Sequence, residues 1–211
     1  DSWDRFEYGK DYHFSKSFFE QFADLLKKVP KQALNVIVTT LKNSDYTNHV
    51  GNVKNCYLIY NSDYNENCSY GTDIERSNDC IDNTMIDKCE QSYGSVNCQK
   101  CYKSFYCTDC IDSTDLWFSY DLIGCMNCFG CVGLRNKNYF IFNESFSKNE
   151  YEVKMKELFN GKYNQILENE KKVKEIYLKI PKRYMHGRQN VSVSGEYIYN
   201  SKEVKNSYIV S

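Results

Sequence analysis

Eleven cysteines carry most of the reactive chemistry in this 211-residue chain. Two stretches, CYKSFYCTDC at 101–110 and CMNCFGC at 125–131, contain CxxC pairs, the ligand spacing of structural zinc sites. A zinc site built on Cys125, Cys128 and Cys131 is one interpretation. Disulfides are a second, although an odd number of cysteines cannot all pair within one chain. Packing of the thiols in an apolar core is the third.

The spacing of the cysteines favours core packing. They stand at positions 56, 68, 80, 89, 98, 101, 107, 110, 125, 128 and 131, so every interval is a multiple of three. Other residues in this phase, such as Ile59, Ser62 and Leu116, are mostly small or aliphatic. A period of three fits neither an amphipathic helix nor a flat strand, so it predicts a coil that turns a corner every three residues. In such a coil CxxC arises wherever two neighbouring inward positions are cysteine.

Rows of twelve residues bring similar side chains into columns. One outward column is largely aromatic and contains Tyr57, Ser69, Ile81, Tyr93, Phe105, Trp117 and Phe129. A second is β-branched or tyrosine throughout, which is strand chemistry, and contains Tyr60, Thr72, Thr84, Val96, Thr108, Tyr120 and Val132. We therefore expect a mainly β protein: a narrow β-helix (solenoid) with about 12 residues per coil, capped and followed by α-helices.

Four segments are expected along the chain. An apolar stripe in FSKSFFEQFADLLKKVP predicts a helix over about 15–29 that covers the first coil, and Ser147 with Glu150 forms a capping box that begins a later helix. The three-residue phase returns after Pro181 and predicts inward side chains at Ser192, Gly195 and Ile198. The expected segments are 1–43 with the capping helix, 44–143 as a Cys-rich β-helix of about eight coils, 144–183 as helices, and 184–211 as further β-helix-like coils.

Charge is regional, because 27 basic and 28 acidic residues nearly cancel over the whole chain. Residues 56–131 hold twelve acidic and four basic residues, a net charge of −8, so the coils are acidic. The stretch 171–188 holds seven Lys or Arg against Glu175. Basic residues at the end of a helix either bind phosphate or form a solvated face. The candidates for nucleic-acid contact are Lys171, Lys172, Lys174, Lys182 and Arg183.

Catalytic signatures are missing from the sequence. The three histidines, His13, His49 and His186, lie outside the inward phase, and no Walker loop, GxGxxG, GxSxG or HExxH motif is present. We expect no enzyme and no cofactor, with zinc as the alternative. No apolar run approaches the length of a membrane span. The chain begins at DSWDRF without Met or a signal-like segment, so we expect a piece of a cytoplasmic protein.

Three runs within residues 3–160 form a specific signature: WDRFEYGKDYHFSKSFFEQF, SDYTNHVGNVKNCYL and, above all, NCFGCVGLRNKNYFIFNESFSKNEYEVKMKEL. With these runs the chain resembles an uncharacterised family abundant in candidate-phyla bacteria. Members have an N-terminal zinc ribbon before a Cys-rich repeat. The ribbon's CxxC knuckles are absent here, so its zinc ligands have no counterpart in this sequence. The twelve-residue phase is also similar to the insect antifreeze β-helix, but the TxT rows of that family are absent, so ice binding is not expected.

The sequence therefore predicts a non-enzymatic β-helical scaffold or protein-interaction module whose partner is another protein. Aligned aromatic side chains provide contact area at a small cost in side-chain entropy. The predicted contact face is Tyr57, Tyr93, Phe105, Trp117 and Phe129, unless the flanking helices cover it. The alternative is a nucleic-acid-linked protein, either an acidic DNA mimic or a binder associated with a zinc ribbon.

Overall fold

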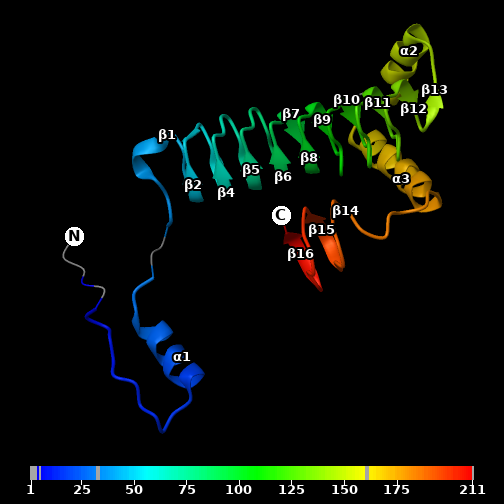
Figure 1. The fold of residues 1–211 in the computed structure, drawn as a ribbon. Coiled ribbons are helices and arrows are strands. Elements are labelled where there is room, and N and C mark those ends of the chain that lie inside the picture. The colour runs from blue at the N-terminus through cyan, green and yellow to red at the C-terminus, as the bar shows by residue number, and fades with distance from the viewer. Residues whose placement is uncertain (1–3, 5, 32–33, 160–161, 211) are drawn as a thin grey trace.

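The computed structural model describes residues 4, 6–31, 34–159 and 162–210. The protein is mainly β, with 38% strand and 21% helix. A row of stacked coils, residues 41–141, occupies the centre and is called the coil stack (Figure 1). Helix α1 (Phe18–Lys28) precedes it, α2 (Lys148–Leu158) and α3 (Tyr163–Lys179) lie at its far end, and a second, short set of coils follows α3.

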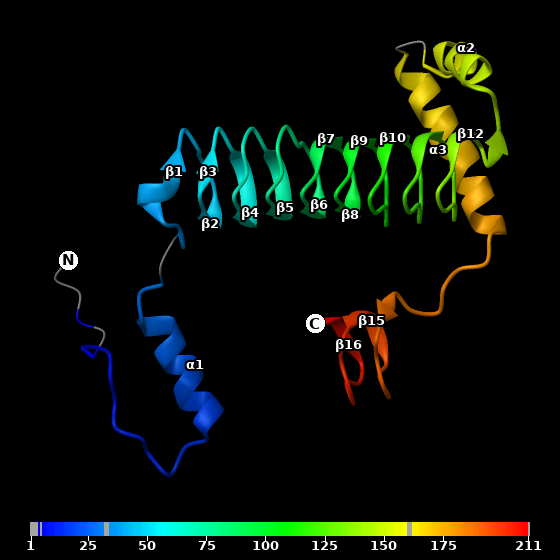
Figure 2. The ribbon, with the colours of Figure 1, turned by 45° about the horizontal axis from the view of Figure 1, so that its top comes forward.

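The strands of the coil stack form parallel sheets on its sides (Figure 2). One sheet has the order β2 (Asn48–Gly51), β4 (Tyr57–Asp63), β5 (Ser69–Glu75), β6 (Thr84–Asp87), β8 (Val96–Gln99). Another has the order β7 (Glu90–Tyr93), β9 (Tyr102–Phe105), β10 (Thr114–Trp117), β11 (Met126–Phe129), β12 (Asn138–Ile141), with β13 (Glu144–Ser145) antiparallel at its end. At the start of the stack, β1 (Leu41–Lys42) pairs with β3 (Val53–Lys54).

Parallel pairing in the coil stack joins each residue to the one twelve positions later. Tyr57 pairs with Ser69, Tyr93 with Phe105, and Trp117 with Phe129. This register reproduces the columns predicted from the sequence, because all of these residues belong to the predicted aromatic column. Parallel sheets in a constant twelve-residue register are consistent with the expected β-helix.

The corners of the coils are residues in the left-handed backbone region. A positive φ recurs at every third position, for example 54° at Asn55, Asn67 and Asp79, so a twelve-residue coil turns four corners. Asn, Asp and Gly tolerate this conformation best. The side chains also join the coils, since Asn55 Nδ2 donates to Asn67 Oδ1 at 3.0 Å and Asn67 Nδ2 donates to Asp79 Oδ1 at 2.9 Å.

Inward positions form the core predicted from the three-residue phase. The eleven cysteines are all buried, together with aliphatic residues such as Ile59, Ile74 and Leu116. The inward amide of Asn83 is satisfied by the backbone: its Nδ2 donates to the Ser92 carbonyl at 3.0 Å, and its Oδ1 accepts from the Ser95 N–H at 2.7 Å. This pairing removes most of the cost of burying an amide. The buried hydroxyl oxygens of Ser92 and Ser104, in contrast, have no hydrogen-bond partner.

Helix α1 does not cover the first coil, contrary to the prediction. The expected cap is present, since the Ser17 hydroxyl accepts from the Glu20 N–H at 3.2 Å, but no residue of α1 is buried. Figures 1 and 2 show α1 standing clear of the coil stack. The first coil is covered instead by the segment before β1, where Val36 bridges to Val50 and packs on the core. The helix pattern predicted an apolar face but contained no information on what that face contacts.

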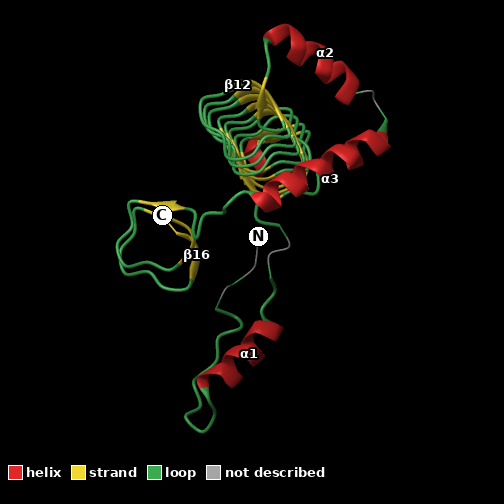
Figure 3. Cartoon of the chain, turned by 90° about the vertical axis from the view of Figure 1, so that its right-hand side faces the viewer, coloured by secondary structure: helices red, strands yellow, loops and turns green. Residues whose placement is uncertain are grey.

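Helices α2 and α3 cover the last coils. The predicted capping box is present at the start of α2, where the Ser147 hydroxyl accepts from the Glu150 N–H and Glu150 accepts from the Ser147 N–H. Val173 of α3 and Tyr151 of α2 join Phe129 in a second buried cluster on the outside of the coils. Figure 3, viewed along the coils, shows α3 lying across one side of their outline.

The C-terminal coils, residues 187–210, form a short second stack. Strands β14 (Gly187–Arg188), β15 (Gly195–Tyr199) and β16 (Ser207–Val210) pair in parallel. The β15–β16 offset is twelve residues, but Gly187 pairs with Ile198 at an offset of eleven. The shorter coil shifts the phase, so Ser192, predicted inward, is an exposed corner with φ 54°. Gly195 has φ 139°, and a Cβ there would lie 1.9 Å from the Ser207 carbonyl oxygen.

Candidate functional site

The predicted aromatic contact face is divided into an exposed and a covered part. Tyr57 and Tyr93 are 40% and 38% exposed. Phe105 and Trp117 are half-buried and stacked, with ring centroids 4.0 Å apart. Phe129 is fully buried within the cluster that α2 and α3 complete. The prediction is therefore wrong for Phe129, which contacts helices of its own chain and is out of reach of a partner.

The cysteines of the CxxC stretches lie inside the coils. The thiols of Cys125, Cys128 and Cys131 each donate to the carbonyl oxygen two residues earlier, at 3.5, 3.3 and 3.4 Å. A hydrogen bond with the Cys128 thiol, together with burial, raises the pKa of Cys125 well above its usual value. All eleven cysteines are free thiols. In the described part of the chain, no group of three or more His, Cys, Asp or Glu residues is arranged to hold a metal ion.

The predicted basic set is spread along α3 and the segment after it. Three of its members make contacts within the chain: Arg183 Nη2 lies 3.2 Å from Asp121 Oδ1, Lys182 Nζ lies 4.0 Å from the centre of the Tyr177 ring, and Lys172 Nζ lies 5.9 Å from that of Phe142. Lys171 and Lys174 are exposed on α3. The structure thus brings Arg183 against Asp121 of the acidic coils, which offsets part of its charge, whereas Lys182 contacts a ring of α3.

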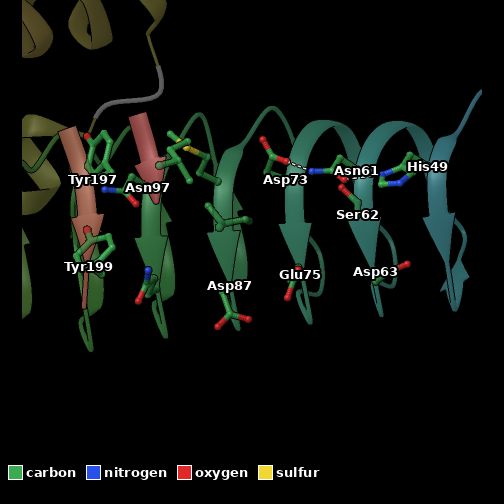
Figure 4. A pocket seen from close by; sticks show the side chains of 14 residues that line it. His49, Asn61, Ser62, Asp63, Asp73, Glu75, Asp87, Asn97, Tyr197 and Tyr199 are labelled. Carbon is green, nitrogen blue, oxygen red and sulfur yellow. Dashed lines mark hydrogen bonds between the residues drawn. The ribbon is translucent and has the colours of Figure 1, made fainter. Parts of the chain in front are cut away.

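A groove between the coil stack and the C-terminal coils gathers polar side chains that the sequence analysis did not group together (Figure 4). Its volume is 370 Å³, and one wall is the sheet β2-β4-β5-β6-β8. The C-terminal coils contribute Ile209 and two tyrosines, Tyr197 and Tyr199, which we call the tyrosine wall and which lie at the β8 end of the groove, near Asn97 (Figure 4). Two columns of polar residues, each with a twelve-residue spacing, line the wall on the coil stack. We call this cavity the acidic groove.

The first polar column runs along a corner of the coils and consists of His49, Asn61 and Asp73. His49 Nδ1 lies 2.6 Å from Asn61 Oδ1, and Asn61 Nδ2 donates to Asp73 Oδ1 (Figure 4). Since Asn61 offers its Oδ1 to the imidazole, His49 donates from Nδ1 in this arrangement. The Asp73 carboxylate thus stands at the end of a hydrogen-bonded row that fixes its orientation.

The second polar column lies on the face of the sheet and consists of Asp63, Glu75 and Asp87. Strand pairing places Asp63 beside Glu75 and Glu75 beside Asp87, so like charges stand in neighbouring coils about 4.8 Å apart. Arg76 Nη2 pairs with Asp87 at 2.7 Å and with Glu75 at 3.0 Å. Asp63 accepts a hydrogen bond from the Gly51 N–H at 2.6 Å. Like charges in register repel one another, and one guanidinium offsets only part of this charge.

The tyrosine wall is held in place by contacts with the coil stack. Tyr197 donates its hydroxyl to Asp109 Oδ1 at 3.1 Å and stacks on the His186 ring, with ring centroids 5.3 Å apart. His186 Nδ1 also contacts Glu196. Burial, and then the nearby Asp109 carboxylate, raise the pKa of both Tyr197 and Tyr199. Both phenols therefore remain neutral hydrogen-bond donors at physiological pH.

Carboxylates along the groove and phenol rings at its β8 end suit cationic groups (Figure 4). An ammonium or guanidinium group gains charge-assisted hydrogen bonds from the carboxylates and a cation–π contact from the rings. The sequence carried part of this signal, since Asp63, Glu75 and Asp87 recur at twelve-residue intervals. The tyrosine wall could not be found in this way, because it lies more than a hundred residues further along the chain.

No protein-family model matches the chain, and no curated protein shows significant similarity to it. Among the helices that the structure describes, none is long and apolar enough to cross a membrane.

Proposed function

We propose that the chain is a non-enzymatic β-helical scaffold of twelve-residue coils that binds a basic segment of another protein in the acidic groove. The observation that carries the proposal is the register of Asp63, Glu75 and Asp87 along a groove that Tyr197 and Tyr199 border at its β8 end (Figure 4). A bound cation relieves the repulsion between the aligned carboxylates, so part of the binding energy comes from strain already present in the free protein.

The shape of the groove favours an extended segment as the ligand. Its acidic wall runs across successive coils, from His49 on β2 to Gln99 on β8. A chain lying along this wall presents Lys or Arg side chains to several carboxylates in turn, and their aliphatic parts pack on the tyrosine rings. Nucleic acid does not suit this site, because its phosphates would face the same carboxylates.

Fluorescence anisotropy with a labelled, extended twelve-residue peptide rich in lysine tests the proposal directly. The informative variant is Asp63→Asn with Asp73→Asn, which removes two charges and keeps the oxygens that accept from Gly51 and Asn61. The matched control is Glu90→Gln with Asp112→Asn, which removes the same charge from residues outside the groove. We expect the groove variant to bind about tenfold more weakly at low salt and the control to bind as the wild type does.

Equal weakening in both variants would show that only the overall charge of the coils attracts the peptide. A glutamate-rich peptide of the same length, bound equally well, would contradict the proposal outright.

The state of the cysteines supports a reducing compartment. All eleven thiols are unpaired and buried in the narrow interior of the coils, and cytosolic proteins keep their thiols reduced. We therefore place the scaffold in the cytoplasm as part of the same proposal. Protein purified from the cytoplasm without reductant should release eleven thiols on denaturation, and a deficit caused by disulfides would contradict this assignment.

A further inference from the structure

Helix α1 presents an apolar stripe that has no partner in the described chain. Phe18, Phe19, Phe22 and Leu26 are 58%, 79%, 46% and 41% exposed, and no residue of the helix is buried. Phe18 and Phe22 stack on each other with ring centroids 5.8 Å apart. An amphipathic helix is stabilised mainly by packing of its apolar face, so this stripe marks a contact surface.

The first coils carry an exposed aromatic surface, Tyr46, Tyr57, Tyr60 and Tyr70, which we call the tyrosine face. These residues are between 40% and 69% exposed. Tyr46 and Tyr57, and likewise Tyr57 and Tyr70, make edge-to-face ring contacts at 5.5 and 5.7 Å. Beside Tyr60 and Tyr70 lies an open hollow of 340 Å³, bordered also by Leu58 and Thr84. The face is therefore preorganised and has room for an inserted side chain.

The tyrosine face is the counterpart of the surface that α3 covers at the other end of the stack. By the twelve-residue register, Tyr46 and Tyr70 share a column with Phe118, and Tyr57 shares a column with Phe129. Phe118 and Phe129 are buried, in one cluster with Val173 of α3. In the last coils these two columns therefore contact a helix, α3. In the first coils the same two columns are not covered by a helix.

The length and charge of α1 fit the tyrosine face. Eleven residues of helix are about 16 Å long, and the coils from Tyr46 to Tyr70 rise by about 10 Å before the rings are counted. Lys27 and Lys28 end the helix, while Asp45 and Asp82 are exposed next to the tyrosines in the same two columns. Opposite charges therefore meet at the edge of an otherwise apolar contact.

The chain leaves α1 in an extended form. Val29 is extended, with φ −69° and ψ 125°, and Pro30 follows it. Proline restricts both its own φ and the conformation of the residue before it, so the helix ends here and does not continue towards the coils. Figure 3 shows α1 projecting away from the coil outline.

We propose that α1 of one copy docks on the tyrosine face of a second copy, and that two chains exchange their N-terminal helices in a symmetric dimer. Reciprocal exchange fills both faces and buries both stripes with one type of contact. With several aromatic side chains on each side, two such contacts bury on the order of 1,200 Å², the area of a stable interface. This dimer is independent of the acidic groove, which none of these residues lines.

Light scattering after gel filtration, at tens of micromolar protein, tests the exchange. The informative variants are Phe18→Ala with Phe22→Ala on the helix and Tyr57→Ser with Tyr70→Ser on the face. The control is Tyr184→Ser, which removes a 95% exposed ring elsewhere in the chain. We expect the wild type and the control to be dimers and both double variants to be monomers. Circular dichroism of each variant separates loss of the dimer from loss of the fold.

A monomeric wild type would overturn the proposal, and docking of α1 on its own chain would give this result. A dimer that resists both double variants would overturn it as well, since the contact would lie elsewhere. A dimer lost in only one double variant would overturn the pairing of α1 with the tyrosine face.

Discussion

The first and last coils of the stack use the same outward columns in opposite ways. Where α2 and α3 cover the columns, the residues are Phe118, Phe129 and Phe142, and the first two are buried. Where the columns are uncovered, the corresponding residues are Tyr46, Tyr57 and Tyr70, and all three are exposed. A phenyl ring is suited to a dry contact, whereas a phenol keeps its hydroxyl in water. In these outward columns, phenylalanine therefore marks the coils that the chain's own helices cover, and tyrosine marks the coils that they leave exposed.

The inward positions do not differ between the first and last coils, because thiols and aliphatic side chains line the core at both ends. The largest expected effect on stability is therefore that of alkaline pH, which acts on the thiols of the whole core. Hydrogen bonds with neighbouring thiols, and burial, raise the pKa of six cysteines above the value in an unfolded chain. They are Cys68, Cys89, Cys98, Cys110, Cys125 and Cys128. Hydrogen bonds between thiols lower the pKa of the other partners Cys56, Cys80, Cys101 and Cys131.

Above the pKa of an ordinary thiol, the cysteines of the unfolded chain ionise while the buried cysteines with a raised pKa stay protonated. Ionisation then favours the unfolded state and lowers the free energy of unfolding. The contribution of these buried cysteines is complete below about pH 8.5 and is lost as the pH rises towards the folded pKa, by up to about 1.4 kcal/mol per thiol and pH unit. The cysteines with a lowered pKa add nothing further above that pH, since they are ionised in both states. We expect the free energy of unfolding in urea, measured with a reductant present, to fall by several kcal/mol between about pH 8.5 and pH 10. Constant stability up to pH 10 would contradict the buried thiol core.

The second prediction compares one column at its covered and uncovered ends. Phe129→Ala removes a fully buried ring that contacts Phe118 and Phe142 edge-to-face, and should lower the free energy of unfolding by about 3–5 kcal/mol. Tyr57→Ala, in the same column, should cost less than about 1 kcal/mol in the monomer. Chemical denaturation of both variants measures the difference. Equal losses would mean that the helices do not seal the last coils.

The third prediction compares two glycines in one corner column. A Cβ at Gly130 would lie 2.6 Å from the Phe142 ring and 2.9 Å from Val173, whereas at Gly94 it would lie 3.1 Å from the Tyr106 ring, and both residues have positive φ. Gly94→Ala should cost about 1 kcal/mol of backbone strain, and Gly130→Ala about 2 kcal/mol or more, because steric overlap under α3 is added. Thermal unfolding reports both values, and a larger loss at Gly94 would reverse the comparison.

The smallest effect is expected where the chain leaves α3. Arg183 pairs with Asp121 at 3.2 Å, and about half of its side chain is exposed. Arg183→Gln should therefore change the free energy of unfolding by less than about 1 kcal/mol, and less still in high salt. A loss above 2 kcal/mol would show that this ion pair, and not the apolar cluster, fixes the segment after α3.

The repeat made most of the coil stack predictable from sequence. Inward cysteines, corner residues such as Asn55 and the pairing of Tyr57 with Ser69 all follow from a phase of three and a period of twelve. The docking of helices did not follow, because an amphipathic pattern shows that a face is apolar but not what it meets. That is why α1 was wrongly placed on the first coil and Phe129 on the surface.

The acidic groove could not be predicted from the sequence for a related reason. Its carboxylate column repeats at twelve residues and was visible as separate acidic positions, but Tyr199 joins the groove only through the length of α3 and the turn after it. One coil of eleven residues before β15 then shifts the phase that the sequence analysis extended to Ser192. Such long-range placement depends on packing and leaves no periodic signal.

The proposed function is the binding of a basic segment in the groove formed by the acidic columns and the tyrosine wall. The most direct test is a titration of the isotopically labelled protein with the lysine-rich peptide, followed by amide NMR shifts. We expect saturable shifts at Asp63, Glu75 and Asp87 and at Tyr199, with none at Lys171 or Lys174 on α3. Shifts spread evenly over the acidic surface, or confined to residues outside the groove, would contradict this proposal.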